Sequence, residues 1–290
     1  MNVMIGSNEG VWLHARKGHT EKIREFLMRR EASCVTVTEA LCGNPSSHRK
    51  RGQFTVFSES GEVRSCIFHT PNGFVFPVIS EEGLPRPGML HRKLRSLNAN
   101  LFCIMGLRRD VQQFQTLVGE EAVETVQYYH MHRMCAAPIP PQPLPEHMTV
   151  RRAGPEDAEA LYPIQREYEI EEVVLHPERF DGAACMHQLK DSLRRQLVYA
   201  VENNGRFVAK AQTNARGIHW DQIGGVYTST ALRGQGIAGA IMRKLLRDLD
   251  REKRNSSLFV KQNNEPALRM YRRLGYSTSD EFTIAYYRGI

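Results

Sequence analysis

The stretch "LRGQGIAGAIMRKLL", residues 232–246, places two glycines directly before an amphipathic segment. Gly234 and Gly236 have no side chains that could block an approaching ligand, and glycine adopts backbone angles that other residues avoid. The residues after these glycines repeat apolar side chains at helical spacing, which predicts a helix over 236–250. Its apolar face is formed by Ile237, Ile241, Leu245 and Leu249. The stretch therefore predicts a tight loop that leads into a core-facing helix.

The loop also has the features of an anion site. We predict a strand over 223–228, directly before the loop. The first turn of a helix exposes unpaired N–H groups at the positive end of its dipole, and Arg233 adds a charge there. This combination suits a diphosphate. Taken alone, the same letters also fit a plain strand-to-helix connection.

Two motifs in this half of the chain resemble the signatures of the GNAT acetyltransferases. The first is "RGQGIA", residues 233–238, with the pattern Arg-x-x-Gly-x-Ala. The second is "NNEPALRMYRRLGY", residues 263–276, with the pattern Asn-x-x-Ala-x-x-x-Tyr-x-x-x-Gly-aromatic. Its matching residues are Asn264, Ala267, Tyr271, Gly275 and Tyr276. The resemblance covers about residues 148–290 and rests on both motifs in the right order and spacing.

The resemblance implies acetyl-CoA binding and direct acetyl transfer to an amine, without a metal. The acceptor would be a small amine, an amino acid or a protein N-terminus. Backbone amides of the glycine loop would hold the pyrophosphate, and main-chain groups at the end of the preceding strand would meet the pantetheine and the thioester carbonyl. The implied cofactor-binding residues are Val226, Tyr227, Thr228, Arg233, Gly234, Gln235, Gly236, Ile237, Ala238, Asn264, Ala267 and Tyr271.

The resemblance assigns Tyr271 as the general acid that protonates the departing CoA thiolate. A phenol with an ordinary pKa near 10 is protonated at neutral pH and can donate that proton. Core packing is the competing interpretation of Tyr271, because it shares a predicted helix face with Ala267, Leu268 and Leu274. A second function class also stays open: a GNAT-fold protein that binds or senses an acyl-CoA without turnover.

The general base is less well defined. An ammonium nucleophile must lose a proton before it attacks, directly or through water. The segment "YEIEEV", residues 168–173, lies in the region that borders the acceptor site in GNAT proteins. Glu171 or Glu172 could attract a cationic substrate or take its proton, and an exposed acidic helix end explains them equally well. His219 and Asp221 are weaker candidates.

A proline-rich segment divides the sequence. Residues 135–147 contain five prolines and predict an extended linker between domains at 1–134 and 148–290. The C-terminal half alternates predicted strands and helices, which predicts an α/β fold with a mixed sheet. The N-terminal half repeats this rhythm weakly and lacks both motifs, so we predict a degenerate GNAT-like domain without a cofactor site. We expect the acceptor pocket near the domain junction.

The composition excludes several other classes. The 290 residues carry a net charge of +7 and contain no apolar run long enough to cross a membrane. Six cysteines without a CxxC pair and an N-terminus unlike a signal peptide predict a cytoplasmic protein. The basic clusters at 48–51, 91–95 and 251–254 lack a recognition pattern, so we expect no nucleic-acid partner. His130, His132 and Cys135 lack a fourth ligand, so we expect no metal.

Overall fold

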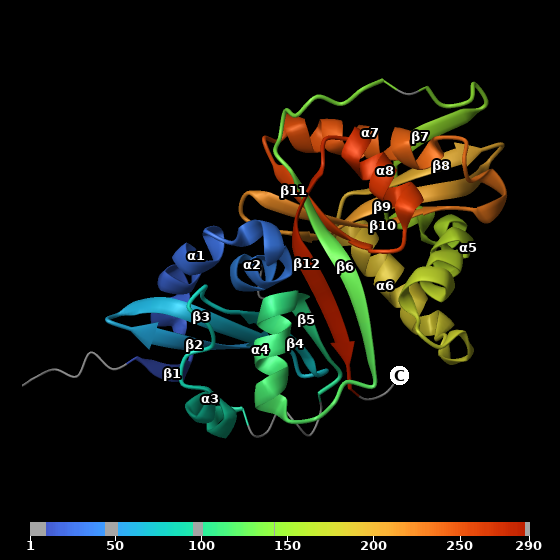
Figure 1. Cartoon of the computed structure of the whole chain (residues 1–290). Coiled ribbons are helices and arrows are strands. Elements are labelled where there is room, and N and C mark those ends of the chain that lie inside the picture. Colours follow the sequence, from blue (N-terminus) through green and yellow to red (C-terminus); the bar gives the residue numbers. More distant parts are fainter. Residues whose placement is uncertain (1–9, 44–51, 95–100, 142, 288–290) are drawn as a thin grey trace, which may run out of the picture. The chain divides into compact units, whose positions relative to one another are not determined.

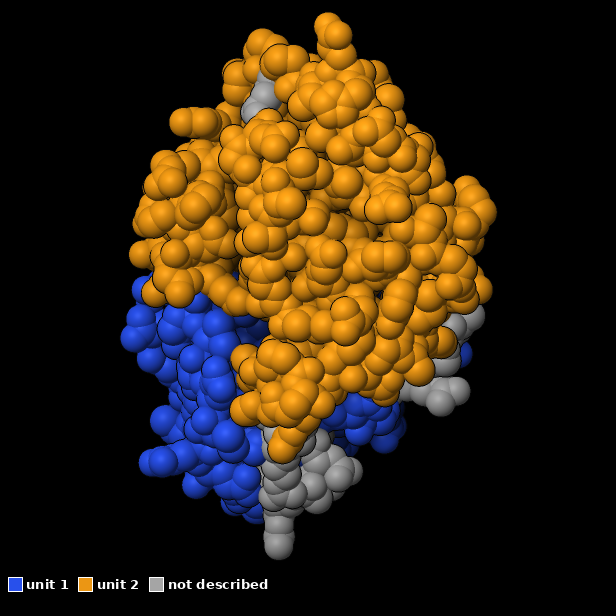
Figure 2. Space-filling view, turned by 90° about the vertical axis from the view of Figure 1, so that its right-hand side faces the viewer, with its two compact units in different colours: residues 1–128, 280–289 blue, residues 129–279, 290 orange. Residues whose placement is uncertain are grey.

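The computed structural model describes residues 10–43, 52–94, 101–141 and 143–287. The chain divides into two compact units, coloured separately in Figure 2. Unit 1 comprises residues 1–128 with 280–289, and unit 2 comprises residues 129–279 with 290. The domain boundaries expected from the sequence stay a prediction. The basic cluster at 48–51 lies outside the described residues.

Unit 2 alternates strands and helices, as the sequence predicts (Figure 1). Its elements are β7 (Met148–Arg152), α5 (Ala158–Tyr168), α6 (Gly182–Arg195), β8 (Val198–Asn203), β9 (Arg206–Arg216), β10 (Trp220–Thr228), α7 (Ile237–Arg251), β11 (Asn255–Lys261) and α8 (Glu265–Arg273). A single turn of π-helix, η6 (Glu169–Val173), extends α5. The strands lie in the order β11-β10-β9-β8-β7, with β10 and β11 parallel and the other pairs antiparallel.

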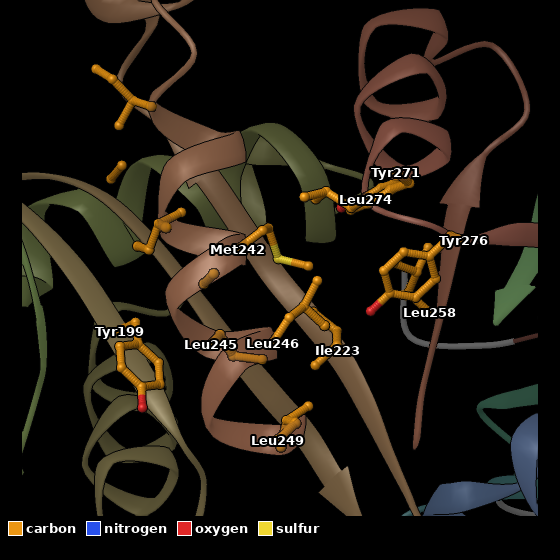
Figure 3. Close-up of a cluster of buried hydrophobic side chains, with 14 of the residues drawn as sticks. Tyr199, Ile223, Met242, Leu245, Leu246, Leu249, Leu258, Tyr271, Leu274 and Tyr276 are labelled. Atoms are coloured by element: carbon orange, nitrogen blue, oxygen red, sulfur yellow. The ribbon is translucent and has the colours of Figure 1, made fainter. Parts of the chain in front are cut away.

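Helices cover both faces of this sheet. Helices α7 and α8 bury one face, where Ile237, Ile241, Leu245 and Leu249 are at most 1% exposed and confirm the predicted apolar stripe. Figure 3 shows part of this core, with Met242 and Leu246 of α7 near Ile223 of β10. Helices α5 and α6 pack on the opposite face, against Val198, Ala200 and Tyr227. The sheet therefore separates two apolar layers.

Local sequence explains several boundaries in unit 2. A tight turn joins β8 and β9, with Asn204 and Gly205 both at positive φ, +48° and +75°. Such a pair is typical of the tight turns that match the twist of a hairpin. Helix α6 begins after Asp181, whose carboxylate accepts hydrogen bonds from the N–H groups of Ala183 and Ala184. Aspartate at this position satisfies donors that the first helical turn leaves unpaired.

Unit 1 follows the same element order. It contains β1 (Val11–His14), α1 (Thr20–Met28), α2 (Val35–Cys42), β2 (Gln53–Glu59), β3 (Glu62–His69), β4 (Phe74–Val78), α3 (Pro87–Lys93), β5 (Cys103–Leu107) and α4 (Arg108–Val118). Strands β2, β3 and β4 form an antiparallel meander with turns at Ser60-Gly61 and Asn72-Gly73. Helices α2 and α3 were not expected from the sequence. They are seven or eight residues long, too short for a clear apolar period.

The last strand of each half lies in a position that the sequence does not indicate. Strand β12 (Ser277–Tyr286) pairs antiparallel with β5, from Phe282 opposite Leu107 to Tyr286 opposite Cys103. Strand β6 (Glu124–Arg133) is the sheet neighbour of β11. The strand that follows α8 therefore extends the sheet of unit 1, and the strand that follows α4 extends the sheet of unit 2.

The proline-rich segment contains no helix or strand among its described residues, and it packs on unit 2. The Arg133 guanidinium, fully buried, pairs with the Asp250 carboxylate of α7 at 2.8 Å and donates to the carbonyl of Ala137. The Ala136 N–H donates to the same Asp250 carboxylate at 3.0 Å. Ile139 and Leu144 pack against the core beneath α7. The prolines keep the chain extended along this surface.

Within the described part of the chain, no helix is long and apolar enough to cross a membrane.

Candidate functional site

The loop after β10 leaves the beginning of α7 open. Gly234 and Gly236 adopt left-handed backbone angles, with φ of +81° and +77°, and Gly236 is the N-cap of α7. A Cβ atom added at Gly234 would meet nothing within 4 Å. Only glycine takes up such angles without strain, so the sequence folds into this loop at little cost. The first N–H groups of α7 begin at this open loop, as an anion site requires.

The end of β10 is irregular next to that loop. The pairing with β9 places Gly224 opposite Gln212 and Tyr227 opposite Lys210, so Gly225 and Val226 form a bulge. Gly225 has a φ of +56°, and a Cβ atom there would lie 2.6 Å from the Lys210 ammonium. Bulges redirect main-chain groups out of the ladder and are common beside active sites.

Strands β10 and β11 pair closely over a short stretch. Their parallel register runs from Trp220 to Gln222, although β10 continues to Thr228 and β11 to Lys261. Beyond Gln222 the main-chain groups of β10 are therefore outside this register. An extended ligand could pair with them there.

Thr228 at the end of β10 carries a buried polar atom without a partner. The residue is 8% exposed, and its Oγ1 makes no hydrogen bond with any described residue. A buried unpaired hydroxyl is uncommon and points to a ligand or an ordered water. Together with the open helix start, Thr228 fits a site for a diphosphate-bearing group such as CoA.

Arg233 turns back from the loop onto the sheet. Its Nε donates to the carbonyl of Thr228 at 3.1 Å, and its guanidinium pairs with the Glu171 carboxylate at 2.7 Å. The Tyr227 hydroxyl donates to the same carboxylate oxygen at 2.7 Å. The Arg233 hydrogen bond lowers the pKa of Glu171, whereas burial and the Glu171 contact raise the pKa of Tyr227. Glu171 thus joins the loop, β10 and η6.

Glu172 has a different partner and lies near Tyr271. Its carboxylate pairs with the Lys261 ammonium at 2.9 Å. Burial, reinforced by the charge of Glu172, raises the pKa of Tyr271 above its usual value. The Tyr271 ring packs edge-on against Tyr276, with ring centroids 5.8 Å apart (Figure 3). Tyr271 therefore keeps its proton across the physiological range and is also part of the core.

The remaining residues predicted to bind the cofactor differ in how far their side chains are exposed. Ile237 is 1% exposed, so a ligand at the loop could reach its N–H and not its side chain. Gln235 is exposed, and Val226, Ala238 and Ala267 are half-buried. The Asn264 side chain accepts from the N–H of Ala267 at 3.2 Å and caps α8.

The weaker base candidates lie elsewhere. Asp221 is fully buried and pairs with the guanidinium groups of Arg254, at 2.7 Å, and Arg216, at 3.3 Å. Two cations hold this carboxylate, so it ties strands together. His219 accepts, through its carbonyl, a hydrogen bond from the N–H of Asn255.

The metal interpretation of the histidine pair gains no support. His130 is 3% exposed and its Nδ1 lies 2.7 Å from the Ser279 hydroxyl. The His132 ring packs edge-on against Trp220. Among the described residues, no group of three His, Cys, Asp or Glu side chains could hold a metal ion.

A charged cluster between α5 and the sheet was not predicted from the sequence. Lys210 is fully buried, and its ammonium donates to the Gly225 carbonyl at 3.1 Å and to the Gln212 amide oxygen at 3.2 Å. Glu169 of η6 accepts from Gln165 at 2.8 Å. Burial lowers the pKa of Lys210, and the charge of Glu169 partly opposes that shift. One feature of the sequence could have indicated this cluster. Lys210, Gln212 and Asn214 place polar side chains on alternate positions of an otherwise apolar strand.

Comparison with known proteins identifies the family of the C-terminal half. Residues 158–276 match the model of the acetyltransferase (GNAT) family. A mycothiol acetyltransferase of Segniliparus rotundus is 30% identical over 176 residues, which cover 55% of this chain and 63% of that protein.

Solved structures extend the likeness of fold to both units. A tandem GNAT protein from the clavulanic acid biosynthesis pathway has a TM-score of 0.58 at 13% identity, covering 97% of this chain and 99% of that chain. A GNAT protein from Sphaerobacter thermophilus has a TM-score of 0.60 at 14% identity, covering 99% of this chain and 98% of that chain. The mixed α/β fold is thus that of tandem GNAT proteins, and residues 158–276 form a domain of the acetyltransferase (GNAT) family.

Proposed function

We propose that this protein transfers an acetyl group from acetyl-CoA directly to an amine acceptor. The observation that carries the proposal is the open beginning of α7, where Gly234 and Gly236 adopt left-handed angles and a Cβ atom added at Gly234 would meet nothing within 4 Å. This arrangement suits the pyrophosphate of CoA. The relative from Segniliparus rotundus, named as an acetyltransferase, supports the same reaction class.

In this proposal the bulge of β10 receives the reactive end of the cofactor. Val226, Tyr227 and Thr228 lie outside the parallel register with β11, and Tyr227 and Thr228 pair with β9. The main-chain groups of these residues that are directed toward β11 would pair with the pantetheine. A main-chain N–H there would donate to the thioester oxygen, on which negative charge develops as the amine attacks.

Tyr271 would protonate the leaving thiolate. Its burial favours the neutral phenol, which is the form that can donate. Packing against Tyr276 holds the ring in one place, so the position of the donor is fixed before the thiolate forms.

The two glutamates would act on the acceptor side. Glu171 is already paired with Arg233, which lowers its pKa and makes it a weaker base than an ordinary glutamate. We therefore propose that Glu171 holds the loop and attracts the cationic acceptor. Glu172, paired with Lys261, remains the candidate that takes the proton. The acceptor would be a small amine, an amino acid or a protein N-terminus.

The test is the thermal stability of the protein with and without acetyl-CoA, alongside Gly236→Glu. A ligand that binds only the folded state stabilises it, by about 2.7 kcal/mol at a hundredfold excess over Kd. We expect an increase in Tm for the wild type and none for Gly236→Glu, whose carboxylate would repel the pyrophosphate.

A matched control is Gly205→Glu, in the β8–β9 turn. Gly205 has almost the same φ as Gly236, +75° against +77°, and a Cβ atom added there would meet nothing within 4 Å. The variant should lose stability through the same backbone strain and keep the acetyl-CoA response. An absent response in the wild type would contradict the proposal. A response without acetylation of any amine would favour the acyl-CoA-binding or sensing alternative.

A further inference from the structure

The buried ammonium of Lys210 occupies a place where an apolar side chain would be expected. Lys210 pairs in register with Ala200 of β8 and Tyr227 of β10, so all three lie on the face covered by α5 and α6. Ala200 and Tyr227 belong to the apolar layer on that face. Burying a charge costs free energy unless hydrogen bonds compensate for the lost hydration, so the partners of Lys210 determine whether the charge is tolerated.

The partners of Lys210 converge on the bulge. Its ammonium donates to the carbonyl of Gly225, and the Tyr168 ring lies 4.5 Å from it. Gly225 favours glycine because its φ is +56°, and a Cβ atom there would also lie 2.6 Å from the ammonium. The bulge and the lysine therefore fit each other.

The carbonyl of Gly225 belongs to the same peptide group as the N–H of Val226. In a planar trans peptide these two groups point in opposite directions. A cation on the oxygen pulls electron density from the peptide and makes its N–H a stronger donor, the cooperative effect seen in hydrogen-bond chains. An ammonium makes this contact a charge-assisted one.

We propose that Lys210 is a positioning residue that polarises the Gly225–Val226 peptide, so that the Val226 N–H becomes the main donor to the thioester oxygen. The inference rests on the proposed function for its catalytic meaning. The polarised peptide itself is a property of the protein without ligand. Lys210 keeps its protons throughout, so it forms and breaks no covalent bond. The hydrogen bond from Val226 only stabilises the negative charge that develops on the thioester oxygen.

Three groups on the covering elements face Lys210. They are Tyr168 of α5, Glu169 of η6 and Cys185 of α6. Burial is the largest influence and lowers the pKa of Lys210 to about 8, against smaller opposite effects of Glu169 and Cys185. Burial raises the pKa of Cys185 to about 11, so this thiol stays neutral where Lys210 titrates. The Lys210 charge is thus present at pH 7 and disappears as the pH rises through about 8.

The first experiment needs no ligand. The amide resonance of Val226 is followed by NMR between pH 6 and 10 in protein labelled with [15N]valine, with assignment through Val226→Ile. We expect a transition near pH 8 in the wild type. It should be absent in Lys210→Met and unchanged in Lys190→Met, which removes an exposed lysine of α6.

Two further variants separate the neighbours of Lys210. Glu169→Gln should keep the transition and move it to lower pH, because the carboxylate favours the ammonium form. Lys210→Gln offers an uncharged donor to the same carbonyl and should abolish the transition. A Val226 resonance that does not titrate, or that still titrates in Lys210→Met, would overturn the inference.

The second experiment measures kinetics. Lys210→Met should lower kcat about tenfold and leave the Kd of acetyl-CoA within about twofold, since the polarised donor matters most for charge in the transition state. Lys210→Met leaves the Gly225 carbonyl without this donor, so Lys210→Gln, which keeps an uncharged donor, is measured beside it and should lose kcat in the same way. An unchanged kcat would overturn the catalytic role. A wild type that binds no acetyl-CoA would overturn the proposed function while the NMR result stands.

Discussion

The two units share an order of elements and differ in the segment after their fourth strand. In unit 2, β10 leads through the open glycine loop into the 15-residue helix α7. In unit 1, β4 leads into α3, which is seven residues long and begins with Pro87. The loop between β4 and α3 forms hydrogen bonds with other parts of unit 1. The Leu84 N–H donates to the Gln113 side chain at 2.6 Å, and the Trp12 indole N–H donates to the Pro85 carbonyl at 2.7 Å.

The helix after the fifth strand of each unit buries an aromatic ring at the same position, and only the ring in unit 2 carries a hydroxyl. Helix α4 of unit 1 and α8 of unit 2 bury the same positions counted from their N-caps, Val111 and Phe114 in α4 and Leu268 and Tyr271 in α8. Unit 1 thus has a phenylalanine where unit 2 has the candidate general acid. The same burial pattern builds both folds, and the chemistry depends on a few groups that packing does not require.

The largest expected effect comes from making unit 2 resemble unit 1 at that position. Tyr271→Phe removes the hydroxyl and keeps the ring in the core, so kcat should fall by about 10²–10⁴-fold. The Kd of acetyl-CoA should change little. Steady-state kinetics with isothermal titration calorimetry would measure both quantities.

A neighbouring tyrosine provides the control. The Tyr276 hydroxyl lies 2.7 Å from that of Ser256 in the same core. Tyr276→Phe should lower stability by about 1 kcal/mol and keep turnover. Unchanged turnover in Tyr271→Phe would mean that another group protonates the thiolate.

A substitution in unit 1 should have a smaller effect than Tyr271→Phe, on stability instead of turnover. Asp110 is the third residue after the N-cap of α4, where α8 has Ala267, and burial raises its pKa to about 6. A pKa raised above the unfolded value near 3.9 means that folding favours the protonated form. Its stabilising contribution is complete below about pH 4 and disappears as the pH rises through about 6.

Asp110→Asn should therefore raise the free energy of unfolding at pH 7, by an amount on the order of 3 kcal/mol. Below pH 4 the variant and the wild type should be equally stable. Chemical denaturation followed as a function of pH measures this difference. A gain that is the same at pH 3.5 and 7 would show that titration of Asp110 is not its cause.

Much of unit 2 was predictable because its signals are local. The spacing from Ile237 to Leu249 fixes α7, and the Asn204-Gly205 pair fixes a hairpin. The glycine loop and Tyr271 could be named as candidates because they lie in compact sequence motifs. Lys210 could not be named as a candidate, since the role proposed for it depends on a bulge in another strand.

The sheet positions of β6 and β12 also could not be predicted, because they depend on residues far away in the sequence. Their sequences predict strands, but nothing local states which partner each one has. Because β6 lies beside β11, a fragment beginning near residue 147 would lack a strand of unit 2. Inactivity of such a fragment would therefore not place the acceptor pocket at a domain junction.

The smallest expected effect tests the cap of α8. The Asn264 side chain accepts from the Ala267 N–H, whereas α4 begins after Leu107 without a side-chain cap. Asn264→Ala should cost about 1 kcal/mol of stability, and Asn264→Asp should restore most of it. Thermal unfolding of both variants, measured with and without acetyl-CoA, compares the two roles of this residue. If Asn264 acts only as a cap, acetyl-CoA raises Tm equally in all three proteins. A smaller acetyl-CoA response in Asn264→Ala than in the wild type would show that the side chain also contacts the cofactor, as the GNAT resemblance implies.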